Sequence, residues 1–71
     1  MNTKKQIYAK ADFESIRLKQ GLSLRDIAKK TGLTPGVLSK MEHGRAIMPR
    51  SAGKICKALG CDFDSLFDLR G

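Results

Sequence analysis

Residues 22–44 read LSLRDIAKKTGLTPGVLSKMEHG, and this stretch decides the fold. Ser23 is followed three residues later by Asp26, the pattern of a capping box that starts a helix. Gly32 ends that helix, because glycine readily takes the left-handed conformation found at helix C-termini. The pattern therefore predicts a helix over residues 24–31, followed by a tight turn.

A second helix is predicted directly after the turn, over residues 35–42. Thr34 is a favourable N-cap, and Pro35 fits the first helical position, where its missing N–H is not needed. Two short apolar-faced helices that meet at such a corner form a helix-turn-helix, whose second helix can lie in the major groove of DNA.

Further helices are predicted on both sides of this motif. Apolar residues at helical spacing, followed by Gly21 and Gly60, indicate helices over residues 12–20 and 51–59, with a loop over residues 43–50. Asp62 can cap a short further helix over residues 63–67. We find no pattern that predicts a strand. The expected fold class is therefore all-α, a compact five-helix domain over residues 11–69.

Residues 1–10 are polar and basic, and we expect a flexible N-terminal tail. The alternative is a basic arm whose Lys4, Lys5 and Lys10 touch phosphates.

The chain has 71 residues with 14 Lys and Arg against 7 Asp and Glu, a net charge of +7. This charge suits a polyanion, nucleic acid first and an anionic membrane surface second. No apolar run approaches the roughly 20 residues that cross a bilayer, and the N-terminus lacks the apolar segment of a secretory signal. We therefore expect a cytoplasmic protein without a membrane partner.

Cys56 and Cys61 are expected to be reduced thiols in that compartment, with a disulfide as the alternative. A Cys-x4-Cys pair without a nearby His makes a poor zinc site, so we expect no metal and no cofactor. His43 is the only histidine, and no acid partner or nucleophile stands at motif spacing from it. We therefore expect that the protein is not an enzyme.

The run from Phe13 to Phe67 resembles the lambda-repressor-like helix-turn-helix family of Cro and Xre type. The most specific parts are GLS before the second helix, I-A-x-x-x-G-L-T across the turn, L-S-K-M-E-x-G at the end of the third helix and A-L-G-C-D-F-D-S-L-F at the close. The resemblance implies a five-helix domain that binds operator DNA, most often as a dimer and often as a repressor.

The resemblance also implies a structural ion pair and a dimer surface. Arg17 and Glu42 occupy positions that family members often fill with a paired Arg and Glu, which would give the inward-pointing Arg17 a partner. A dimer surface is expected between Gly60 and Leu69. Its candidate residues are Cys61, Phe63, Phe67 and Leu69, although the apolar residues there could instead complete the core.

The recognition helix departs from the family at its start, where Pro35 and Gly36 replace polar residues that read bases. Proline and glycine have no side chain that reads a base edge, so DNA shape is expected to carry more of the specificity. Lys40 can donate to guanine, or it can hold only a phosphate. The candidate base contacts are Thr34, Gly36, Val37, Ser39 and Lys40.

Phosphate contacts are expected from helix N-termini and from the cations of the following loop, although each of these cations alone could be a solvated surface charge. The candidates are Ser23, Leu24, Arg25, Thr34, His43, Arg45 and Arg50.

The sequence thus predicts a sequence-specific DNA-binding transcriptional regulator, a repressor that places helix 35–42 in the major groove. As a homodimer on double-stranded DNA it would hold two recognition helices about 34 Å apart on a near-palindrome. The alternative is an antitoxin-like or antirepressor-like module of the same fold whose main partner is a protein. A basic peptide that binds membrane surfaces is disfavoured, because the apolar residues follow a globular pattern.

Overall fold

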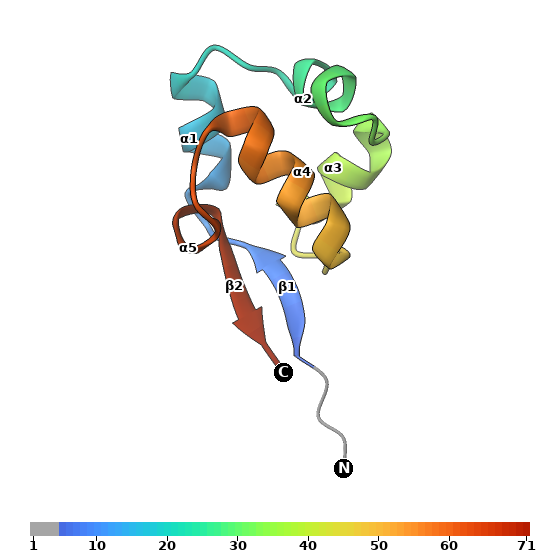
Figure 1. The fold of residues 1–71 in the computed structure, drawn as a ribbon, viewed down its shortest axis with the longest axis vertical. Coiled ribbons are helices and arrows are strands. Elements are labelled where there is room, and N and C mark those ends of the chain that lie inside the picture. The colour runs from blue at the N-terminus through green and yellow to red at the C-terminus, as the bar shows by residue number, and fades with distance from the viewer. Residues whose placement is uncertain (1–4) are drawn as a thin grey trace.

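The computed structural model describes residues 5–71 of the chain (Figure 1). Two short strands, close to the two ends of the chain, stand below a group of helices (Figure 1). In chain order the elements are β1 (Gln6–Ala9), α1 (Phe13–Lys19), α2 (Leu24–Thr31), α3 (Pro35–Glu42), α4 (Pro49–Leu59), α5 (Phe63–Leu66) and β2 (Phe67–Arg70).

The helix-turn-helix of α2 and α3 has the bounds that the sequence predicts. Ser23 Oγ accepts from the Asp26 N–H at 3.1 Å, and Asp26 Oδ2 accepts from the Ser23 N–H at 2.8 Å, which completes the predicted capping box. Gly32 has a φ of 79° and ends α2 in the left-handed conformation. Thr34 Oγ1 accepts from the Val37 N–H at 3.2 Å and starts α3. Local hydrogen bonds therefore define both ends of the turn.

The strands correct the all-α prediction, because β1 and β2 form a two-stranded antiparallel sheet. The pairing runs from Gln6 opposite Arg70 to Ala9 opposite Phe67. The Ile47 N–H donates to the Ile7 carbonyl at 3.0 Å, so β1 is also attached to the loop after α3.

The expected flexible tail over residues 1–10 is therefore wrong for residues 6–9, which form β1. Their alternation explains why: the side chain of Ile7 is buried in the core, whereas Gln6 is exposed. Residues 1–4, including Lys4, lie outside the described residues.

Three helices differ from their predicted bounds. α1 covers Phe13–Lys19 and not residues 12–20, because Asp12 and Gln20 are its caps. α4 begins at Pro49 and not at Ser51, because proline fits the first turn of a helix and Met48 takes the extended N-cap conformation. α5 ends at Leu66, since Phe67 turns into β2. Asp62 stands at the N-cap of α5, but its side chain accepts from Ser65 Oγ at 2.8 Å instead of from a backbone N–H.

One apolar core joins the helices to the sheet. Phe67 is 1% exposed and lies between two aromatic rings, with ring centroids 5.9 Å from Phe13 and 5.4 Å from Phe63. The largest fully buried side chains are Phe13, Ile27, Leu38, Met41, Ile55, Leu66 and Phe67. Because Phe67 belongs to this core, it is not available to a partner, and its expected place in a dimer surface is wrong.

Candidate nucleic-acid interface

Helix α3 buries one side and exposes the other. Leu38 and Met41 point into the core at 0% and 1% exposure, which fixes the orientation of the helix. On the outer side Gly36 and Lys40, four residues apart, lie in one exposed row. Val37 flanks this row at 42% exposure. The predicted base-contacting residues on this side are therefore accessible to a DNA groove.

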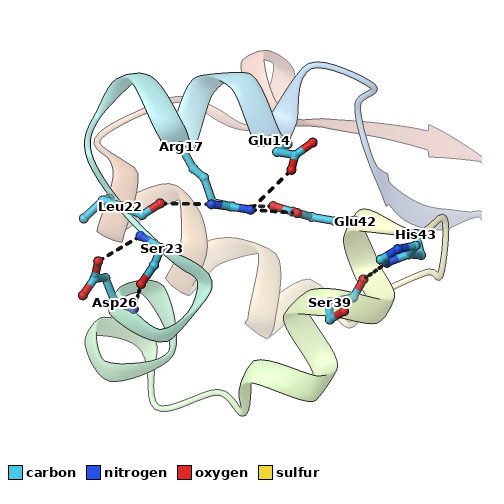
Figure 2. A network of polar contacts seen from close by, with 8 residues as sticks. All are labelled: Glu14, Arg17, Leu22, Ser23, Asp26, Ser39, Glu42 and His43. Atoms are coloured by element: carbon cyan, nitrogen blue, oxygen red, sulfur yellow. Dashed lines mark hydrogen bonds and ion pairs between the residues drawn. The ribbon is translucent and has the colours of Figure 1, made fainter.

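Ser39 differs from the other predicted base contacts because it is half-buried. Its carbonyl accepts from His43 Nδ1 at 2.7 Å, which requires the hydrogen of this ring to be on Nδ1 (Figure 2). The Nε2 atom of the exposed His43 ring remains available to a partner.

The N-terminus of α3 presents bare backbone. Thr34 is exposed, but its hydroxyl already caps the Val37 N–H. Pro35 has no N–H, which leaves the Gly36 N–H as an uncapped donor of the first turn. A Cβ at Gly36 would meet only the Thr34 hydroxyl, at 4.0 Å, so a phosphate or base edge can approach this backbone closely.

The N-terminus of α2 is partly occupied by its own carboxylate. The capping box uses the N–H groups of Ser23 and Asp26, which leaves those of Leu24 and Arg25 for a phosphate. The hydrogen bonds from the Ser23 backbone and hydroxyl lower the pKa of Asp26. Of the three phosphate contacts predicted at this terminus, Arg25 is exposed and Leu24 is half-buried against the core. The N–H and the hydroxyl oxygen of Ser23 are engaged in the cap.

Cations follow the end of α3. His43 and Arg45 are exposed in the loop, as predicted, and the Arg45 N–H donates to the Lys40 carbonyl at 3.0 Å. Arg50 is exposed too, but it lies in the first turn of α4 and not in the loop.

The charge of the domain is concentrated in this region. Residues 22–60, from the start of α2 to the end of α4, contain eight Lys and Arg and only two acids, Asp26 and Glu42. Both acids are bonded within the fold, one to Ser23 and the other to Arg17. The outward charge of the helix-turn-helix is therefore positive, which favours a polyanion.

An ion pair holds α3 against α1 (Figure 2). Arg17 Nε donates to Glu42 Oε2 at 2.6 Å and Arg17 Nη2 donates to Glu42 Oε1 at 3.1 Å, a bidentate arrangement. Arg17 Nη1 also donates to the Leu22 carbonyl at 3.1 Å, and the exposed Glu14 lies 3.8 Å away. The hydrogen bonds to Glu42 raise the pKa of Arg17, so its guanidinium stays charged. It joins α1, the loop before α2 and the end of the recognition helix.

Sequence reasoning missed one part of this surface. Strand β1 packs against α3, and a hollow between them is lined by Gln6, Tyr8, Val37, Lys40, Gly44, Arg45 and Ala46. The alternation of Gln6 and Tyr8 with Ile7 and Ala9 was the available signal, but four residues are too few to separate a strand from a tail.

The predicted dimer residues other than Phe67 lie at or near the surface. Cys61 and Phe63 are half-buried, and Leu69 is 54% exposed. Cys56 and Cys61 are free thiols, and burial raises the pKa of Cys56. In residues 5–71 no group of three or more His, Cys, Asp or Glu side chains is placed to hold a metal ion.

The helix-turn-helix thus has an exposed, positively charged surface. It combines the outer face of α3, the free amides at the starts of α2 and α3, and the surrounding cations. A family model described as helix-turn-helix, of the Cro/C1 type, matches residues 13–66. The chain belongs to this family of DNA-binding regulators. No curated protein and no solved structure matches the chain significantly. None of the helices formed by residues 5–71 is long and apolar enough to span a membrane.

Proposed function

We propose that this chain is a sequence-specific transcriptional repressor that inserts α3 into the major groove of its operator. The observation that carries the proposal is the outward face of α3. It combines Gly36, Val37 and Lys40 in exposed positions, while Leu38 and Met41 fix the helix from behind. The major groove of DNA admits an α-helix, and the flanking cations complement the negative charge of the phosphates.

The contacts divide into base contacts and phosphate contacts. Lys40 donates to guanine O6 or N7, and Val37 contacts a thymine methyl. The backbone of Gly36 and the hydroxyl of Thr34 approach the DNA at the start of α3, and Ser39 contributes from the margin of the helix. Because Pro35 and Gly36 offer no base-reading side chain, sequence-dependent DNA shape supplies the remaining specificity.

Phosphates are held on both sides of the groove. One strand is held at the start of α2, which Ser23 caps. There the backbone amides of Leu24 and Arg25 and the Arg25 guanidinium contact a phosphate. His43, Arg45 and Arg50 hold the other strand, after the end of α3.

The protein binds as a homodimer in this proposal, with two copies of α3 about 34 Å apart on a near-palindromic site. Leu69, Phe63 and Cys61 supply the apolar contact between the two copies. Occupation of such a site within a promoter would block transcription, which is why we propose repression.

Two variants test the division of contacts. Lys40→Ala should weaken operator binding by about 1–3 kcal/mol and weaken binding to random DNA less, because a lost base contact removes discrimination. Arg25→Ala should weaken both alike and lower the slope of log K against log salt by about 0.9, since one phosphate contact is lost. Binding is measured by fluorescence anisotropy at several salt concentrations. Equal losses on operator and random DNA for Lys40→Ala would contradict its role as a base reader.

A second candidate function is that of an antitoxin-like or antirepressor-like module with a protein partner. The side-chain-poor start of α3 at Pro35 and Gly36 and the exposed Leu69 favour it. A mobility shift with mixed genomic fragments at physiological salt separates the two functions. Fragments that all compete no better than bulk DNA would favour the protein partner.

A further inference from the structure

Strand β1 and the recognition helix share a hollow that is open to the same side as the exposed face of α3. Val37 and Lys40 line it from α3, and Gln6 and Tyr8 line it from β1. Arg45 closes it from the loop. Its volume is about 440 Å³, within the range of sites that hold small organic groups.

The chemistry of the lining fits an anion. Lys40 and Arg45 are exposed cations, and none of the acids in residues 5–71 lines the hollow. Gln6 and Tyr8 add neutral hydrogen-bond donors. Tyr8 donates its hydroxyl to Gln6 Oε1 at 2.8 Å, which orients the Gln6 amide so that its two N–H donors remain for another partner.

A third cation lies beside the hollow. The guanidinium carbon of Arg70, from β2, lies 4.5 Å from the centroid of the Tyr8 ring. This cation–π contact holds the ring in place and adds positive charge next to it. Pairing of β1 with β2 is therefore what presents Tyr8 at this position.

The position of the hollow identifies its occupant. Val37 and Lys40 belong both to the hollow and to the outer face of α3. When α3 lies in a DNA major groove, a DNA strand at the edge of that groove therefore passes the hollow. The anionic unit of such a strand is a sugar–phosphate. Tyrosine hydroxyl and glutamine amide groups are common donors to phosphate oxygens.

We propose that β1 is part of the DNA interface and that Gln6 and Tyr8, together with Arg45, hold one sugar–phosphate unit of the DNA backbone, next to the base that Lys40 contacts. The proposal rests on the proposed DNA-binding function and extends it from the helix-turn-helix to the sheet. On the free protein Tyr8 donates to Gln6, and on DNA its hydroxyl donates to the phosphate.

Tyr8→Phe is the sharpest test, because it removes one hydroxyl and keeps the ring that packs against Arg70. Loss of one hydrogen bond to a charged group should weaken binding roughly ten- to a hundredfold on operator and random DNA alike. The salt slope should stay unchanged, because no cation is lost, whereas Arg45→Ala should lower it by about 0.9. Ser65→Ala is the matched control, since it removes an exposed hydroxyl from α5 and should leave DNA binding unchanged. Thermal unfolding of both variants verifies that the fold is intact.

A second readout reports on the position itself. Tyr8 is the only tyrosine, so protein labelled with 3-fluorotyrosine gives a single fluorine NMR signal from β1. The signal should shift when operator DNA saturates the protein. If Tyr8→Phe binds DNA with wild-type affinity and the fluorine signal stays unshifted in the saturated complex, β1 has no role in DNA binding. The proposed function of the helix-turn-helix would then still stand. If Tyr8→Phe loses affinity for operator DNA but not for random DNA, Tyr8 contacts a base and not a phosphate, which would overturn the proposal. A wild-type chain that binds no DNA would overturn the proposed function as well.

Discussion

Glu42→Ala should destabilise the domain strongly, because it leaves the Arg17 guanidinium without its main partner. The two side chains are only 9% and 11% exposed, and removing one partner of a buried pair costs about 3–5 kcal/mol. Arg17 keeps its hydrogen bond to the Leu22 carbonyl and its contact with Glu14, so we expect the lower end, about 3 kcal/mol. A chain of 71 residues has a total stability of about 4–11 kcal/mol, so the variant loses a large fraction of it.

Urea unfolding followed by far-UV circular dichroism measures this loss, and Tm should fall by roughly 10–25 °C. Glu14→Ala is the matched control, because it removes another partner of Arg17 that is 65% exposed and lies at 3.8 Å. That surface contact should contribute less than about 0.5 kcal/mol. The double variant Arg17→Met/Glu42→Leu should recover to within about 1 kcal/mol of the wild type, because it leaves no charge buried.

The reasoning would be refuted by a loss below about 1 kcal/mol for Glu42→Ala, or by a double variant no more stable than the single one. Either result would mean that water replaces Glu42 at no cost and that the pair does not hold α3 in place.

Three further predictions concern local features. The pKa of Asp26 is lowered in the folded chain, so its capping box stabilises the fold at pH values above the unfolded pKa of about 3.9. This contribution is lost as the pH falls through the lower folded pKa. In thermal melts between pH 7 and pH 2, Asp26→Asn should therefore lose less stability than the wild type, and equal losses would contradict this. Gly32→Ala should cost about 1 kcal/mol in urea unfolding because of the φ of 79°, whereas Gly53→Ala, inside α4 with open space around it, should stabilise by up to about 1 kcal/mol; changes of the same sign would contradict the conformational argument. The pKa of Cys56 is raised in the folded chain, so less of its thiol is in the reactive thiolate form. In the Cys61→Ser variant at pH 8, Cys56 should therefore react with iodoacetamide more slowly in the folded chain than in urea. Equal reaction rates would contradict this prediction.

The helix-turn-helix could be predicted from sequence because its boundaries are fixed locally. Ser23 and Asp26 bond to each other within one turn, and Gly32 ends α2 through its own backbone conformation. Thr34 caps a helix that begins at the next residue. None of these interactions needs a distant partner, so the residue pattern contained them all.

The sheet could not be predicted in the same way, because its pairing joins the two ends of the chain. Ile7 pairs with Leu69, and neither four-residue strand identifies the other. The sequence predicts Phe67 at the end of a helix and leaves open whether it lies in a dimer surface or in the core. In the structure it begins β2 and packs in the core beside Phe13. The start of α4 at Pro49 could have been predicted, because proline is favoured in a first helical turn.

The same distinction applies to the candidate site. The exposed positions of Gly36, Val37 and Lys40 followed from helical spacing, since Leu38 and Met41 had to face the core. The position of Gln6 and Tyr8 beside this helix could not be predicted from helical spacing, because it depends on the pairing of β1 with β2.

Selection of bound sequences from random double-stranded DNA tests the central claim most directly. A helix-turn-helix that reads bases through Val37 and Lys40 should enrich one motif, and a dimer should enrich it as two inverted half-sites about one helical turn apart. Lys40→Ala should lose preference at one base pair of each half-site. Selection that enriches no motif over the starting pool, at salt concentrations where the protein binds DNA, would contradict sequence-specific recognition by α3.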